Sequence, residues 1–146
     1  MAYLFDTNHC IYLMNGWNTP EDKLSECERN TIRTFRRLKD DVIYMSEASV
    51  GELWYGIERS QRQAYNRTRL NTLLLAVPPL PVTRKIWELY GQTKAELSKV
   101  GKIIPDIDLV IASTAQYHEM ILIANDKHMK YLPTSFSRKN WAAGEE

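Results

Sequence analysis

Residues 3–8 read Tyr3-Leu4-Phe5-Asp6-Thr7-Asn8, so three apolar, β-favouring residues run directly into an acid and two small polar residues. A continuous apolar run is typical of a parallel strand that is buried on both faces. In an open α/β sheet, ligand-binding groups gather beyond the carboxyl ends of the strands. We therefore expect Asp6 at that edge, on a central strand. The alternative is that Asp6 or Thr7 only caps the helix that follows.

The rest of the chain alternates between apolar runs and segments with helical spacing. Further buried strands are predicted at 42–45 and 120–124, with short extended edges at 80–82 and 135–141. Helices are predicted over 8–15, 20–39, 46–58, 61–77 and 83–100, and from Pro105 onward. This alternation predicts a three-layer α/β/α fold around a central, mostly parallel sheet. A length of 146 residues fits a single domain spanning 1–146.

The composition is that of an ordinary soluble globular protein, with 44% hydrophobic residues, 25% charged residues and a net charge of +1. Cys10 and Cys27, without a CxxC or Cys/His cluster, favour reduced thiols over a disulfide or zinc site. The N-terminus has no signal-peptide pattern. The longest apolar runs, 73–77 and 120–124, are far too short to span a bilayer. We therefore expect a cytoplasmic protein without a membrane partner.

The predicted helix over 46–58 combines a core-facing stripe with an acid. The stripe recurs at helical spacing and consists of Val50, Leu53, Trp54 and Ile57. Glu52 lies beside it, and Gly56 removes a side chain from the same face one turn later. A helix glycine costs about 1 kcal/mol relative to alanine, so we expect something to approach the helix closely there. Read alone, Glu52 is an ordinary exposed helix residue.

Four acids are expected near one edge of the sheet. Asp6, Asp108 and Asp126 each follow a predicted strand or begin a predicted helix, and Glu52 can join them from its own helix. Each has a simpler explanation as a cap, a dipole partner or a surface residue. Several carboxylates in one place repel one another unless a cation lies among them. All-oxygen ligation favours Mg²⁺ or Mn²⁺, which typically work on phosphates. Together the four acids predict metal-assisted phosphodiester hydrolysis.

Basic residues are clustered although the net charge is small. The stretch from Arg59 to Trp87 contains six basic residues and no acid. Such a cluster either follows a phosphate backbone or forms a solvated helix face. If it binds a backbone, the candidates for substrate binding are Arg62, Arg67 and Arg69.

Four short stretches resemble, in order and spacing, the acidic motifs of PIN-domain ribonucleases. They are Leu4-Phe5-Asp6-Thr7-Asn8, Glu52-Leu53-Trp54-Tyr55-Gly56, Asp108-Leu109-Val110-Ile111-Ala112 and Asn125-Asp126-Lys127-His128. The resemblance covers essentially the whole chain, whose size is similar to that of the VapC toxins of toxin–antitoxin pairs. It implies that the catalytic and metal-binding residues are Asp6, Glu52, Asp108 and Asp126.

The same resemblance implies further properties. Asp106 is implied as a helper in metal binding, and Thr7 and Asn8 as hydrogen-bonding residues that contact the substrate side of the site. The implied reaction is Mg²⁺- or Mn²⁺-dependent hydrolysis of RNA by a metal-activated water, which leaves 5′-phosphate and 3′-hydroxyl ends. An antitoxin partner and a homodimer are implied as well. Ala124 departs from the family, which often has Thr or Ser there, so no hydroxyl is available at that position.

Other protein classes fit the sequence less well. A haloacid-dehalogenase-like phosphatase needs a second Asp two residues after the first, and this chain has Asn8 there. A receiver domain needs paired acids before the end of its first strand, where this chain has Tyr3-Leu4-Phe5. The remaining alternative is a PIN-like domain that binds RNA or protein without cutting. In a cutting enzyme, repulsion among the acids leads us to expect that Asp6→Asn stabilises the metal-free fold.

Overall fold

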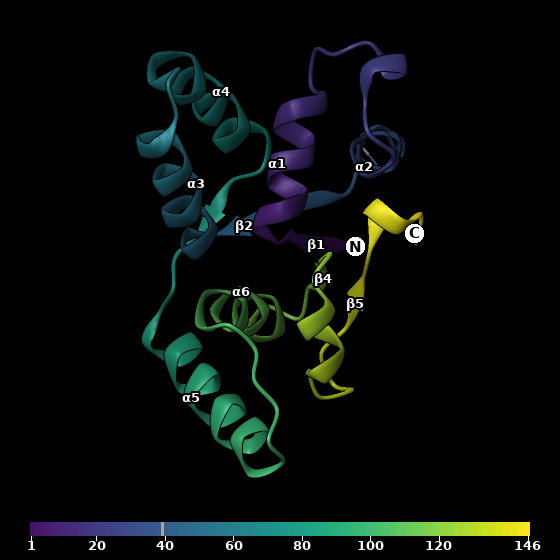
Figure 1. Cartoon of the computed structure of the whole chain (residues 1–146). Helices are drawn as coiled ribbons and strands as arrows, with labels where there is room; N and C mark the ends of the chain where they lie inside the picture. Colours follow the sequence, from purple (N-terminus) through teal and green to yellow (C-terminus); the bar gives the residue numbers. More distant parts are fainter. Residues whose placement is uncertain (39) are drawn as a thin grey trace.

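The computed structural model describes residues 1–38 and 40–146 and contains a sheet of five parallel strands, in the order β3-β2-β1-β4-β5 (Figure 1). The strands are β1 (Ala2–Phe5), β2 (Val42–Ser46), β3 (Pro79–Leu80), β4 (Ile121–Ile123) and β5 (Arg138–Lys139). The first strand of the chain is thus the central strand, as residues 3–8 predict. The two edge strands are only two residues long, which leaves little unpaired backbone for association with another sheet.

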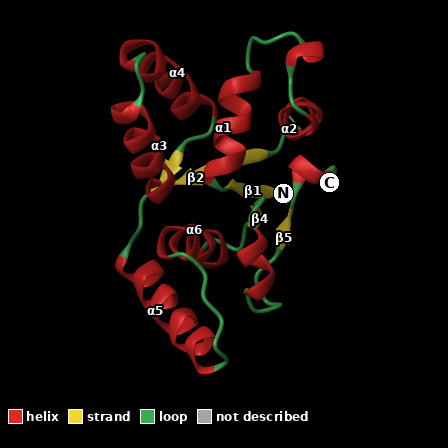
Figure 2. Ribbon diagram, in the orientation of Figure 1, coloured by secondary structure: helices red, strands yellow, loops and turns green. Residues whose placement is uncertain are grey.

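Helices cover both faces of the sheet and complete the three predicted layers (Figure 2). The α-helices are α1 (Thr7–Gly16), α2 (Glu26–Arg37), α3 (Glu47–Arg59), α4 (Gln63–Ala76), α5 (Arg84–Lys99) and α6 (Asp106–Tyr117). Three short 3₁₀ helices are η1 (Glu21–Lys23), η2 (Lys127–Tyr131) and η3 (Trp141–Ala143). In the part of the chain that is described, no helix has the length and apolarity needed to cross a membrane.

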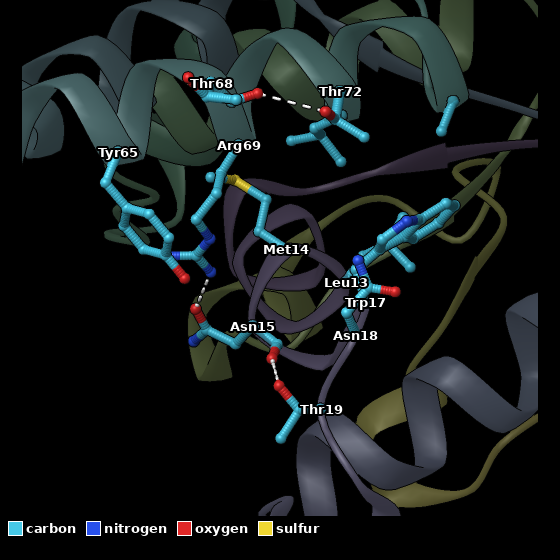
Figure 3. Close-up of a pocket in the computed structure, with 12 residues that line it drawn as sticks. Leu13, Met14, Asn15, Trp17, Asn18, Thr19, Tyr65, Thr68, Arg69 and Thr72 are labelled. Carbon is cyan, nitrogen blue, oxygen red and sulfur yellow. Dashed lines mark hydrogen bonds between the residues drawn. The ribbon is translucent and has the colours of Figure 1, made fainter.

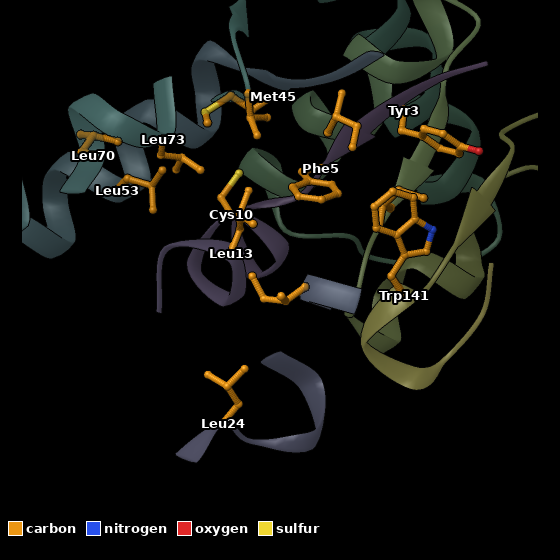
Figure 4. Close-up of a cluster of buried hydrophobic side chains, with 14 of the residues drawn as sticks. Tyr3, Phe5, Cys10, Leu13, Leu24, Met45, Leu53, Leu70, Leu73 and Trp141 are labelled. Atoms are coloured by element: carbon orange, nitrogen blue, oxygen red, sulfur yellow. The ribbon is translucent and has the colours of Figure 1, made fainter. Parts of the chain in front are cut away.

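The side chains of alternate residues of β1 pack into two separate hydrophobic cores, one on each face of the sheet. Tyr3 and Phe5 point into the layer formed with α1 to α4, whereas Leu4 is buried in the layer formed with α5 and α6. Figure 4 shows the first of these cores, in which Trp141 stands against Phe5 in a T-shaped pair with ring centroids 5.3 Å apart. Aromatic pairs of this geometry contribute about 0.5–1.5 kcal/mol beyond their burial. The C-terminal η3 is therefore anchored directly on the central strand.

The prediction of a helix over 20–39 is wrong about where the helix begins. Pro20 opens only the 3₁₀ turn η1, and α2 begins after Ser25. Ser25 and Glu28 form a reciprocal capping box, in which each side chain accepts a hydrogen bond from the other residue's backbone N–H. The capping box formed by Ser25 and Glu28, rather than Pro20, therefore determines where the α-helix begins. The helix ends at Arg37, and the predicted end at Lys39 lies outside the described residues.

Two expectations for α3 also need correction. Leu53 and Ile57 are buried as predicted, but Trp54 is 39% exposed because it lies at the side of the stripe, where Arg67 of α4 covers its ring at 5.8 Å. No atom lies within 4 Å of a Cβ built at Gly56. Among residues 1–38 and 40–146, the close approach expected at Gly56 is therefore not made.

Candidate metal-binding active site

Asp6 both ends the central strand and begins a helix. Its backbone N–H donates to the carbonyl oxygen of Ile123 at 2.9 Å, which extends the pairing of β1 with β4 by one residue. Its side chain accepts a hydrogen bond from the backbone N–H of His9 at 2.8 Å and so caps α1. Asp6 is only 3% exposed. The cap and the position at the carboxyl edge, treated as alternatives in the sequence, are thus both present.

Three nitrogen atoms contact the Asp6 carboxylate and hold it in place. Oδ1 contacts the His9 ring nitrogen Nδ1 at 2.8 Å in addition to the His9 backbone N–H. Oδ2 accepts from the backbone N–H of Asn125 at 2.9 Å, in the segment that follows β4. Asn8 contributes to the same arrangement, because its Nδ2 donates to the Asn125 carbonyl at 3.1 Å. The carboxylate therefore has a fixed orientation before any ligand binds.

Glu52 reaches the site through the start of α1. Thr7 is hydrogen-bonded through its hydroxyl to the Glu52 carboxylate. The same hydroxyl lies 3.1 Å from the Ser49 hydroxyl. Thr7 directly follows Asp6, so this contact brings the acid of α3 to the residue next to the acid of β1.

Asp108 experiences the charges of the other three acids. It lies in the first turn of α6 and is partly buried. Burial, followed by the negative charges of Asp126, Glu52 and Asp6, raises the pKa of the Asp108 carboxyl from 3.8 to about 6, against a smaller opposing effect of His128. The four acids expected from the sequence therefore share one electrostatic site.

Asp126 is stabilised in its charged form. It caps η2 by accepting from the His128 backbone N–H at 2.7 Å, and the His128 ring nitrogen Nδ1 lies 2.7 Å from the same oxygen. Burial raises the pKa of the Asp126 carboxyl, but the hydrogen bonds and charge of His128, together with a hydrogen bond from Asp108, outweigh burial and bring the net pKa below its usual value. One acid of the site is thus held ionised beside another that resists ionisation.

The chemistry of these donors fits a hard divalent cation. All four side chains offer carboxylate oxygens, and their mutual repulsion is what a cation would relieve. Over residues 1–38 and 40–146, no three acid, histidine or cysteine side chains converge in a preformed metal cage. Mg²⁺ suits such a site, because it usually keeps several waters and takes one or two carboxylates together with substrate phosphate oxygens.

Asp106 is not brought to the four acids by its contacts. Its carboxylate is exposed and pairs with Lys94 at 2.7 Å and with the Tyr90 hydroxyl at 2.8 Å, both on α5. The hydrogen bond from Lys94, and then that from Tyr90, hold the pKa of the Asp106 carboxyl below its usual value. These contacts give Asp106 a role in joining α6 to α5.

The three arginines proposed for substrate binding contact other parts of the chain. Arg62 stacks over Tyr65 at 3.9 Å, and Arg67 pairs with Glu58 at 3.4 Å. Arg69 lines a cavity of about 330 Å³ between α1 and α4 and donates to Asn15 Oδ1 at 2.7 Å (Figure 3). Asn15 lies nine residue steps along α1 from the helix cap Asp6, a rise of about 13.5 Å. The contact of Arg69 with Asn15 therefore lies well along α1 from Asp6, and backbone binding by the three arginines stays a prediction.

Sequence reasoning missed His9 as a partner of the site. A signal exists, because His9 is the third residue after the helix cap Asp6 and so occupies the position from which capping-box side chains turn back. Asn140 was also missed; its Nδ2 donates to Asn125 Oδ1 at 2.9 Å. No local pattern around Asn140 points to residues so far away in the sequence.

Comparison with known proteins agrees with this geometry. The PIN domain family matches residues 3–134. Ribonuclease VapC2 of Rickettsia felis is 30% identical over 142 residues, covering 97% of this chain and 98% of the relative. The tRNA(fMet)-specific endonuclease VapC of Shigella flexneri is 25% identical over 126 residues, covering 86% and 87%. A crystal structure of VapBC2 from Rickettsia felis bound to a promoter DNA fragment aligns with a TM-score of 0.82 at 28% identity, covering 97% of this chain and 99% of that one. This chain therefore belongs to the PIN-domain family, among the VapC ribonucleases.

Proposed function

We propose that the protein is a divalent-metal-dependent endoribonuclease and the toxin of a type II toxin–antitoxin pair. The observation that carries the proposal is the shared site of Asp6, Glu52, Asp108 and Asp126, seen in the effect of the other three charges on Asp108. Family membership supplies the substrate class, since the relatives are ribonucleases.

The four acids have different parts in this mechanism. Asp6 offers a carboxylate whose orientation is already set by N–H donors, and Asp126 offers one that is held ionised. Asp108 would hold the cation in its carboxylate form, since metal ligands must be deprotonated. Glu52 is held by its hydrogen bond with Thr7 and adds a fourth carboxylate to the site from α3. A bound Mg²⁺ or Mn²⁺ supplies polarisation of the scissile phosphate and a lower pKa for the attacking water.

Partners follow from the relatives rather than from any contact in this chain. The neighbouring structure from Rickettsia felis is a VapBC2 complex, which supports a cognate antitoxin for this protein. The relative from Shigella flexneri is named for the initiator tRNA, which makes a structured RNA a reasonable first substrate to test. We also propose a homodimer, which solution scattering or sedimentation would measure.

The test is RNA cleavage with matched acid-to-amide variants. We expect cleavage with Mg²⁺ or Mn²⁺, no cleavage in EDTA, and losses of at least 100-fold for Asp6→Asn, Glu52→Gln, Asp108→Asn and Asp126→Asn. Asp106→Asn is the matched control, because its carboxylate is in the same helix as Asp108 but is paired with Lys94. Cleavage that survives complete chelation would contradict the metal mechanism. Metal-independent RNA binding without cleavage would instead favour a non-catalytic binding domain.

A further inference from the structure

His9 is a fully buried polar side chain with both ring nitrogens occupied. Its exposure is 0%, and its ring packs between Phe5 and Tyr12 at centroid distances of 5.6 and 5.5 Å. Nδ1 lies 2.8 Å from Asp6 Oδ1, and Nε2 accepts a hydrogen bond from the backbone N–H of Ala142 at 3.2 Å. The ring therefore connects an acid of the site to η3.

The contact with Ala142 determines where the ring proton lies. A backbone N–H only donates, so Nε2 of His9 must present its lone pair. In a neutral imidazole the proton then resides on Nδ1, which donates to Asp6 Oδ1. Asp6 thereby gains a second N–H donor on this oxygen.

This donor limits what Asp6 can offer to a ligand. A carboxylate has about four lone-pair sites, and three are taken by the His9 backbone N–H, the His9 ring and the Asn125 backbone N–H. The remaining site is on Oδ2. His9 thus leaves Asp6 with one direction in which to bind a cation.

The two residues that contact the Asp6 carboxylate, His9 and Asn125, are both hydrogen-bonded to the same short segment, residues 140–142. His9 is held by Ala142, and Asn125 is held by Asn140, whose Nδ2 donates to its Oδ1 at 2.9 Å. Two residues of the segment 140–142 therefore support the two oxygens of one carboxylate. Trp141 between them is fully buried against Phe5, which fixes the segment on the central strand.

We propose that His9 is a positioning residue: it donates from Nδ1 to Asp6 and, held by the segment 140–142, sets the direction in which Asp6 binds the catalytic cation. The inference rests on the proposed metal-dependent function. Hydrogen-bond partners that orient ligating side chains typically contribute 10–100-fold to metal affinity. A histidine that only filled space in the core would have no such effect.

Two amide variants distinguish the contact of ring Nδ1 with Asp6 from the contact of ring Nε2 with Ala142. In His9→Asn, the side-chain Nδ2 takes the place of ring Nδ1 and keeps the donor to Asp6, but the contact with Ala142 is lost. In His9→Gln, the longer side chain reaches the position of ring Nε2 and its oxygen can accept from Ala142, but the donor to Asp6 is lost. Mg²⁺ affinity is measured by calorimetry, and folding by thermal melting in EDTA.

We expect His9→Asn to bind Mg²⁺ within about threefold of wild type and His9→Gln to bind about 10-fold more weakly, whatever the order of their melting temperatures. Equal losses in the two variants, or losses that follow the melting temperatures, would overturn the positioning role. A wild type that binds neither Mg²⁺ nor Mn²⁺ would overturn the proposed function and this inference with it.

A second measurement needs neither a variant nor a metal. Long-range ¹H–¹⁵N correlation spectra of the metal-free wild type are expected to show His9 as a neutral ring with a protonated Nδ1 and an unprotonated Nε2. A proton on Nε2 would overturn the inference even if metal binding and cleavage are both found.

Discussion

Asp6 and Asp108 carry the same side chain in opposite situations. Asp6 receives three N–H donors, whereas Asp108 is partly buried and repelled by its neighbours. The structure therefore changes the expectation that Asp6→Asn stabilises the metal-free fold. An amide at position 6 would turn its NH₂ group toward an N–H donor, a loss of about 1–3 kcal/mol. Asp108 is the acid whose neutralisation relieves repulsion.

The raised pKa of Asp108 predicts a dependence of stability on pH in EDTA. The folded-state pKa is above the unfolded value, so between about pH 4 and pH 6 the unfolded chain releases a proton that the folded protein keeps. Stability from this group is therefore present below pH 4 and lost as the pH rises through about 6. After allowance for solvent screening, we expect a loss on the order of 1 kcal/mol in wild type relative to Asp108→Asn.

Urea unfolding of both proteins at several pH values measures this difference. Asp6→Asn serves as the contrast and should be less stable than wild type throughout the range. If the difference in unfolding free energy between wild type and Asp108→Asn stays constant from pH 4 to pH 7, the raised pKa does not belong to Asp108.

Among the helices, the contact between α1 and α2 depends on the absence of one side chain. A Cβ at Gly16 would lie 2.5 Å from Ile32 Cγ1, and Ile32 is buried in α2. Gly16 directly follows the helix predicted over 8–15 and fits a helix end, but the physical requirement is the close approach of a second helix. Helix ends and close helix contacts both favour glycine, so the residue alone does not distinguish them.

Gly16→Ala is expected to lower the free energy of unfolding by about 1–3 kcal/mol, because Ile32 must move within a packed core. Gly91→Ala is the matched control: Gly91 lies within α5 and a Cβ there meets no atom within 4 Å. It is expected to stabilise by about 0.5–1 kcal/mol, as alanine does in an exposed helix. Chemical denaturation measures both, and equal effects of the two substitutions would contradict the packing argument.

Elements were predictable where their signals are local. The apolar run before Asp6 indicated the central strand. The helix predicted over 83–100 is α5, which Thr83 caps and which is followed by Gly101 at a φ of +69°. The four acids were also predictable, because the carboxyl edge of a parallel sheet collects side chains in a known place. Their supports were not: Asp6 and Asn125 are 119 residues apart and His9 and Ala142 are 133 apart. Only the folded sheet brings such pairs together.

Across the whole molecule, the three arginines proposed for RNA binding and the four acids are two different groups of residues. Arg62, Arg67 and Arg69 lie on or beside α4, where they contact Tyr65, Glu58 and Asn15. A substrate that touched both groups would need to extend over more than one turn of helix along α1. Substituting these arginines therefore tests whether the protein binds RNA beyond the position at which it cleaves.

If RNA follows α4, replacing Arg62, Arg67 and Arg69 by alanine should weaken binding and reduce the salt-dependence slope by about 2, near 0.7 per phosphate contact for a single strand. A control variant removes three charges elsewhere, at Lys23, Arg36 and Lys99, and should change the slope much less. Filter binding of a catalytically inactive Asp108→Asn background over a range of salt concentrations measures both. Equal slopes would assign the α4 arginines to the fold or to a protein partner.

The support of Asp6 by Asn125, 119 residues later in the sequence, has a consequence during synthesis. Chains leave the ribosome N-terminus first, at about 5–20 residues per second. The 119 residues between Asp6 and Asn125 thus correspond to roughly 6–24 seconds in which the first acid exists without the backbone that orients it. We expect the growing chain to have no working nuclease during this interval, so the RNA that surrounds it on the ribosome is spared until residue 125 has been added.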